Sequence, residues 1–129
     1  MMTRRHIIRA LAIGLSGMPG LLSPTSATAT VVEVARLREL LRSPRHARAI
    51  GMAALRRPSA VLAEADPASL VRSLFRHHPA LADDAPLAER RAIFEAGVAA
   101  DFATGRTVLV DGWLLSRSET ELFMLEALH

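Results

Sequence analysis

The chain has 129 residues, of which 50% are hydrophobic, a formal net charge of +3 and no cysteine. The lack of cysteine excludes disulfides, thiolate zinc sites, iron–sulfur clusters, covalently attached haem and cysteine-ligated copper. All 16 basic residues are arginines, and such a bias is by itself weak support for phosphate or nucleic-acid binding.

The first 29 residues have the three parts of an export signal. Arg4 and Arg5 stand in a basic start, an apolar run follows over residues 11–22, and Ala27 and Ala29 form a small-residue cleavage site. The apolar run is short for a membrane span and contains a proline. We therefore expect cleavage after Ala29, with retention as a membrane anchor as the alternative.

The segment Thr3-Arg4-Arg5-His6-Ile7-Ile8-Arg9 resembles the twin-arginine (Tat) signal, Ser/Thr-Arg-Arg-x-apolar-apolar-Lys/Arg. The resemblance implies that the protein crosses to the periplasm already folded, a route often used by proteins that carry a cofactor or travel with a partner that does. Residues 1–29 include three arginines, so 13 arginines face 13 acidic residues in the remainder. A formally neutral mature domain gives no support for a DNA or RNA partner.

Residues 30–129 are expected to form one small, mainly α domain of about four to five helices with one C-terminal β-hairpin. Apolar spacings of three and four predict the first helix over residues 31–41. Ser43-Pro44 starts a second helix, which ends before Pro58. Its inner face is nearly all small and suits a close helix pair: Ala47, Ile50, Gly51 and Ala54.

Asp66-Pro67 repeats the helix-start signal, and the third helix runs to Pro79. The adjacent His77 and His78 fall at its end, where we expect them to be solvated. The longest helix is predicted over residues 86–104, with Gly105 as its left-handed stop. Its inner side is predicted to carry Leu87, Phe94, Val98 and Phe102, with Ile93 and Asp101 flanking them, and its exposed face Glu89, Arg90 and Arg91.

The pattern then changes to a β-hairpin at about residues 106–115. Asp111-Gly112 is a strong two-residue turn signal because both positions favour positive φ. Ser116 and Glu119 have the spacing of a capping box, which opens a last helix.

The hairpin is the candidate interaction site, through Val108, Val110, Trp113 and Leu115. Because an isolated two-stranded hairpin is marginal in water, we expect it to pack on the helices; pairing of its edge with a partner's strand is the alternative. A lone Trp is usually part of a core, which is our expectation for Trp113, although Trp is also enriched at binding hot spots.

No catalytic or metal-binding motif is found in the sequence. His77 and His78 are adjacent and diverge by about 100° on a helix, so they do not readily share one ion. No Gly-x-Ser-x-Gly or glycine-rich phosphate loop is present, and the hydroxyls of Ser116 and Ser118 are expected to bond the backbone of the cap. We therefore expect no enzyme activity, no cofactor and no metal.

A second resemblance covers the C-terminal part. The segment from Asp101 through Asp111-Gly112-Trp113 to Ser118-Glu119 is similar to the end of a group of short Tat-exported proteins, Asp-Gly-Trp-x-Leu-Ser-x-Ser/Thr-Glu. A looser analogy, in size and route, is to the small subunits of periplasmic flavin dehydrogenases. It implies an accessory subunit that escorts or stabilises a larger cofactor-containing oxidoreductase. The alternative is a stand-alone periplasmic binding or structural module.

Overall fold

The computed structural model describes residues 30–56 and 66–129. Arg4, Arg5, Ala27 and Ala29 lie outside the described residues. The chain divides into two units, Met1–Val32 and Glu33–His129, and the second contains all the labelled elements. These are mainly helices with one antiparallel β-hairpin, which confirms the predicted fold class.

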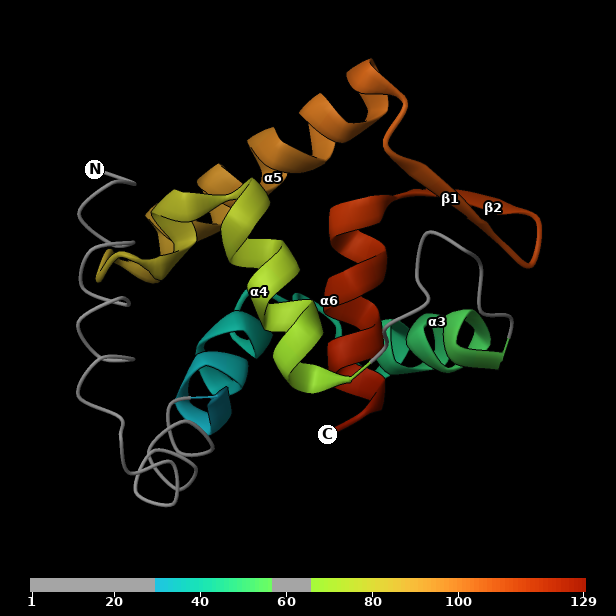
Figure 1. Cartoon of the computed structure of the whole chain (residues 1–129), viewed down its shortest axis with the longest axis horizontal. Coiled ribbons are helices and arrows are strands. Elements are labelled where there is room, and N and C mark those ends of the chain that lie inside the picture. Colours follow the sequence, from blue (N-terminus) through green and yellow to red (C-terminus); the bar gives the residue numbers. More distant parts are fainter. Residues whose placement is uncertain (1–29, 57–65) are drawn as a thin grey trace, which may run out of the picture. The chain divides into compact units, whose positions relative to one another are not determined.

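The elements follow one another as the sequence pattern indicates (Figure 1). Residues 30–38 are helical, and then come α3 (Pro44–Arg56), α4 (Pro67–His77), the 3-10 helix η2 (Pro79–Ala82), α5 (Leu87–Thr104), β1 (Thr107–Val110), β2 (Trp113–Ser116) and α6 (Arg117–Ala127). The first helix is shorter than predicted because its end tightens into a turn, in which the N–H of Leu41 donates to Arg38 O at 3.1 Å.

The predicted helix boundaries at three positions are confirmed by their caps. Asp66 accepts a hydrogen bond from the N–H of Ser69 at 3.0 Å, and Gly105 ends α5 with φ 76°. Ser116 accepts from the N–H of Glu119, whose carboxylate in turn accepts from the N–H of Ser116. These bonds satisfy backbone groups that a helix end leaves unpaired.

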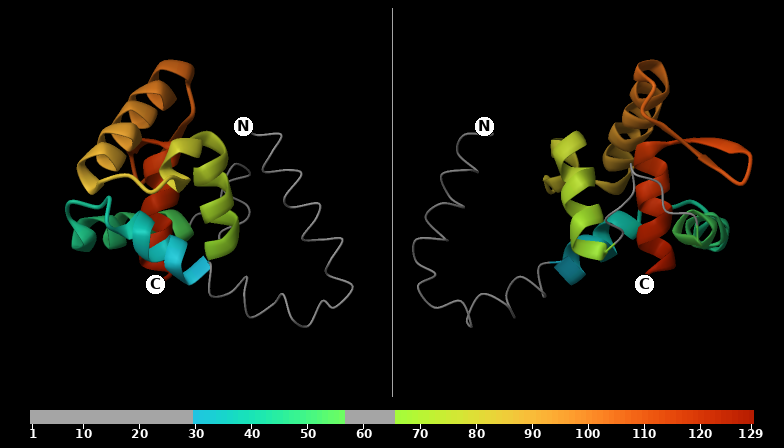
Figure 2. Two further views of the ribbon diagram at one scale, coloured as in Figure 1. Left: turned by 90° about the vertical axis from the view of Figure 1, so that its left-hand side faces the viewer. Right: turned by 45° about the vertical axis from the view of Figure 1, so that its right-hand side comes forward.

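Helix α6 is the centre of the unit. It contacts α3, α4, α5 and both strands, and Figures 1 and 2 show it surrounded by these elements. Leu122, Met124 and Leu125 are almost fully buried. The core of this fold therefore forms around the last helix of the chain.

The close pairing of α3 with α6 follows from the small residues of α3. Ala47, Gly51 and Ala54 are buried, as predicted. A Cβ at Gly51 would overlap the backbone oxygen of Phe123 on α6. Glycine at this position therefore allows the two backbones to approach each other.

The predicted inner face of α5 is wrong in part. Phe102 is 44% exposed, whereas Arg90, Phe94 and Asp101 are buried. The buried face of α5 therefore includes two charged side chains, Arg90 and Asp101. Both are buried because they form hydrogen bonds with residues outside the helix. Arg90, predicted to be exposed, donates to Ala85 O, Arg36 O and Glu39 Oε1 at 3.0, 3.2 and 2.9 Å.

The hairpin forms at the predicted place. Its register joins Thr107 to Ser116 at the base and Val110 to Trp113 beside the turn. Asp111 and Gly112 have φ of 47° and 84°, the positive values that a two-residue turn of this kind requires.

Candidate functional site

The hairpin is held on the helices by one of its faces. Val108 and Val110 are buried, and Leu115, the cross-strand partner of Val108, is half-buried against the same core. Both strands contact α6, and β1 also contacts α3. Three of the four residues predicted as a partner interface therefore attach the hairpin to its own domain, in agreement with the expected packing on the helices.

The opposite face of the hairpin is apolar and exposed. Leu109 and Leu114 are directly opposite each other across the two strands, and they are 70% and 58% exposed. Trp113 pairs with Val110 and so belongs to the inward face, but at the turn end of β2 it is also 73% exposed. We call Leu109, Trp113 and Leu114 the apolar hairpin surface. In Figure 1 and the right panel of Figure 2 the hairpin reaches away from α4 and α5.

The expectation that Trp113 belongs to the core is wrong. The register pairs it with Val110, on the face that packs on the helices, but it lies at the turn end of β2 and remains exposed. Sequence reasoning named Trp113 as the alternative interface anchor and missed Leu109 and Leu114. The alternation of β1, in which Val108 and Val110 point inward, is a signal that identifies Leu109 as outward-facing.

A second cluster, buried this time, joins α4, α5 and α6. The Nε2 atom of His78 lies 2.6 Å from the hydroxyl of Ser118. The N–H of Ser118 donates to Asp101 Oδ2 at 2.9 Å, and Arg106 donates to Asp101 Oδ1 at 2.6 Å. We call His78, Ser118, Asp101 and Arg106 the buried polar chain.

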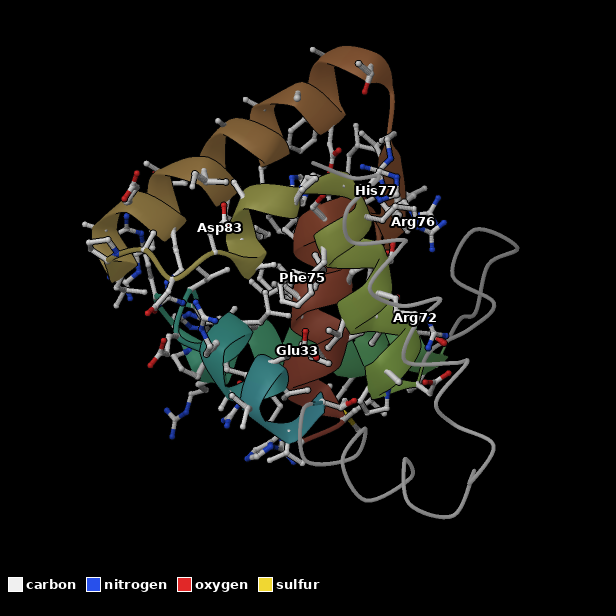
Figure 3. All side chains as sticks on the ribbon, turned by 60° about the vertical axis from the view of Figure 1, so that its left-hand side comes forward. Glu33, Arg72, Phe75, Arg76, His77 and Asp83 are labelled. Atoms are coloured by element: carbon white, nitrogen blue, oxygen red, sulfur yellow. The ribbon has the colours of Figure 1, made fainter. Side chains whose placement is uncertain are left out.

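The position of His78 corrects two expectations. His78 is buried rather than solvated, whereas His77 is exposed on α4 (Figure 3). The hydroxyl of Ser118 meets the His78 ring instead of bonding the backbone of the cap. The missed signal is Gly97, where a Cβ would overlap the His78 ring; a glycine inside a helix commonly marks such a close approach.

Burial acts on the pKa values of His78 and Asp101, two members of the buried polar chain, in opposite directions. For His78, burial lowers the pKa below its ordinary value of 6.5, and the attraction of the Asp101 carboxylate offsets only part of this effect. For Asp101, burial alone would raise the pKa. Hydrogen bonds from Ser118 and the charge of Arg106 outweigh burial, so its pKa is lowered.

The combination of Ser, His and Asp does not form a catalytic triad. In a triad the carboxylate orients the imidazole and the serine oxygen meets the substrate. Here Asp101 accepts from the N–H of Ser118, and Ser118 has no exposed surface. The arrangement ties three helices together and offers no access to a substrate.

The acidic side chains of α6 are likewise occupied within the fold. Glu126 is buried and accepts two hydrogen bonds from Arg38, at 2.7 and 3.2 Å. Glu121 is buried and accepts from the hydroxyl of Ser73 at 2.6 Å. These contacts give both carboxylates a structural role.

A small groove of ≈ 240 Å³ lies between α5, α6 and the turn after residue 38. Its floor includes Phe94 and Leu122, and the ion pair of Arg42 with Glu95, 3.0 Å long, lies at its edge. Small-molecule sites usually occupy about 300–1,000 Å³. The groove is therefore below the usual size of such sites.

Within residues 30–56 and 66–129, no three His, Asp or Glu side chains are placed to hold a metal ion. Over the same two ranges no helix has the length and hydropathy of a membrane span. Neither a protein-family model, nor a curated protein, nor a solved structure matches this chain.

Proposed function

We propose that the protein is a non-catalytic accessory (small) subunit, exported to the periplasm by the Tat pathway, that escorts or stabilises a larger cofactor-containing oxidoreductase. The observation that carries the proposal is the apolar hairpin surface. Leu109, Trp113 and Leu114 expose apolar side chains together on one hairpin, whereas most other large hydrophobic residues in the described part of the chain are buried or half-buried. Exposed apolar patches of this kind mark interaction sites.

The composition of the surface supports a protein partner. Trp is enriched among the residues that dominate binding energies, and Trp113 is the only Trp in the chain. The hairpin attaches to the core by Val108 and Val110, so the other face can bind a partner without losing that attachment. The resemblance of residues 3–9 to a Tat signal supports the route, and the looser analogy to dehydrogenase small subunits supports the type of partner.

The test is affinity purification of a C-terminally tagged full-length chain from the periplasm of its native host, followed by mass spectrometry. We expect a larger oxidoreductase subunit in stoichiometric amount. We expect it to be absent from the periplasm when Arg4 and Arg5 are both replaced by Lys, because the pair is the recognised part of a Tat signal. Recovery of the wild-type protein alone as a monomer would contradict the proposal.

The second candidate function is a stand-alone periplasmic binding or structural module, whose ligand would occupy the small groove between α5 and α6. That candidate predicts a self-sufficient monomer. It also predicts that filling the groove, for instance by Val98→Phe, abolishes ligand binding while substitutions at Leu109 and Leu114 have no effect on it.

A further inference from the structure

The two ends of the hairpin are fastened to the helices by the buried polar chain. Arg106 immediately precedes β1, and its side chain donates to Asp101 on α5. Ser118 lies two residues after the end of β2, and its N–H donates to the other oxygen of the same carboxylate. A backbone bond of 2.9 Å from Arg117 N–H to Arg106 O joins the two ends to each other.

His78 extends this attachment to α4. Its ring contacts the hydroxyl of Ser118 on one side and meets the ring of Phe94 edge-on, with centroids 6.1 Å apart. The missing Cβ of Gly97 leaves the space that the ring fills. One imidazole thus closes the junction between α4, α5 and the start of α6.

The charged groups around the imidazole come from three places. His77 precedes it on α4, Asp101 faces it from α5, and Arg106 acts from the segment between α5 and β1. The 3-10 helix η2 that follows His78 contains no charged residue, and α6 presents the uncharged hydroxyl of Ser118. Asp101 already accepts hydrogen bonds from Arg106 and Ser118. A protonated His78 would therefore be attracted by a carboxylate that is shared with Arg106 and repelled by the Arg106 cation.

We propose that His78 is a pH-sensitive latch, and that its protonation loosens the attachment of the hairpin ends to α4 and α5. Its regulatory meaning rests on the proposed function, because the loosened element carries the apolar hairpin surface. The hairpin would then be firmly attached at neutral pH, and both its attachment and its binding of the partner would weaken on acidification.

The direction of the pH effect follows from the burial of the His78 ring. Since burial lowers the pKa of His78 below 6.5, the opened junction binds the proton more readily than the closed one. Opening is therefore favoured as the pH falls below about 6.5, down to the lowered pKa of the closed form. One proton changes the opening constant by at most about tenfold per pH unit.

The test is amide hydrogen exchange of the full-length chain between pH 7.5 and 5, corrected for the intrinsic exchange rate. The probes are the N–H groups of Arg117 and Ser118, both bonded at the hairpin ends. We expect their opening constant to rise several-fold from pH 7 to pH 5.5 in the wild type and in the His77→Gln control. In His78→Gln, whose side chain does not titrate, we expect no such rise. An equal rise in His78→Gln overturns the proposal.

A measurement on the unmodified protein tests the latch even if the His78→Gln variant does not fold. The NMR titration of the His78 ring is expected to give a pKa below 6.5, and a value at or above 6.5 overturns the latch. Binding is measured separately, as the retention of the co-purified oxidoreductase at pH 7 and pH 5.5. We expect a loss at pH 5.5 in the wild type that His78→Gln lacks, and equal retention refutes the regulation. Capture of no partner at either pH contradicts the proposed function alone, and the exchange data then decide the latch.

Discussion

Gly97 and His78 depend on each other across the α4–α5 contact. In most helices an alanine is more favourable than a glycine by about 1 kcal/mol. At position 97 a Cβ would overlap the buried imidazole of His78. The His78 ring therefore requires glycine at position 97, although helix propensity alone would favour alanine there.

We expect Gly97→Ala to lower the free energy of unfolding by about 1–3 kcal/mol, the usual effect of overpacking a filled site. In a His78→Ala background the same substitution should be neutral or stabilising by up to about 1 kcal/mol, because the ring is absent. Urea denaturation of the four proteins of this cycle measures both effects. An equal loss in the two backgrounds would show that the ring is not the cause.

Asp101 makes the free energy of unfolding depend on pH in the acidic range. Its pKa is lowered in the folded protein, so the unfolded chain takes up the proton first as the pH falls. The stabilisation is fully present well above pH 3.8, the ordinary value, and is lost as the pH falls below it.

The expected result for Asp101→Asn is a smaller loss of unfolding free energy between pH 6 and pH 3 than in the wild type. At pH 6 the variant should also be less stable, because Arg106 loses its charged partner. Chemical denaturation at the two pH values measures both quantities, with Asp84→Asn, an exposed position, as the control. An identical acid response in wild type and Asp101→Asn would contradict this role.

At the scale of elements, the pairing of α3 with α6 depends on a close approach of the two backbones at Gly51. At Gly51 the atom that a Cβ would meet is the backbone oxygen of Phe123, and backbone cannot turn aside as a side chain can. Ala127 on the next turn of α6 also closes the space.

Gly51→Ala is therefore expected to destabilise the protein by about 3 kcal/mol, the upper end of the range for overpacking. The control is Met52→Ala, on the exposed side of the same helix, where changes within about 0.5 kcal/mol are usual. Thermal unfolding monitored by circular dichroism compares the two. A Gly51→Ala protein as stable as the wild type would mean that α3 and α6 are farther apart than described.

Local signals predicted most elements, whereas burial depended on contacts between elements. The Asp66 cap, the Gly105 stop and the Ser116–Glu119 capping box each act within four residues, so the sequence around them was sufficient. The inner face of α5 was misjudged because Arg90, predicted to be exposed, is buried by partners at positions 36, 39 and 85. Hydrophobic spacing within one helix carries no information about such partners.

The candidate site was predictable to a similar extent. The hairpin and its turn followed from Asp111-Gly112, but the exposure of Trp113 depends on which part of the hairpin the helices cover, and that is set by tertiary packing. The buried position of His78 required three helices to meet, which no single segment of the sequence indicates. The sequence therefore located the hairpin correctly and missed which of its side chains are exposed, and the role of the hairpin in binding a partner stays a prediction.

At the scale of the whole molecule, the proposed function requires that the hairpin, which packs on the helices through Val108 and Val110, binds a larger protein through its exposed apolar side chains. Three exposed side chains supply only part of the roughly 800 Å² that each partner contributes to a stable interface. The proposed partner would therefore also contact surfaces beyond the hairpin. Leu109, Trp113 and Leu114 would form the apolar centre of that contact.

The most direct test is the amount of oxidoreductase subunit that co-purifies with a tagged Leu109→Thr/Leu114→Thr protein. Threonine preserves strand propensity and leaves Val108 and Val110 in the core. The control is Met52→Gln, which removes a 43% exposed apolar side chain from α3. We expect at least about a tenfold loss of the oxidoreductase subunit with the hairpin variant and wild-type recovery with the control. Undiminished recovery with the hairpin variant would show that the apolar hairpin surface does not bind the partner.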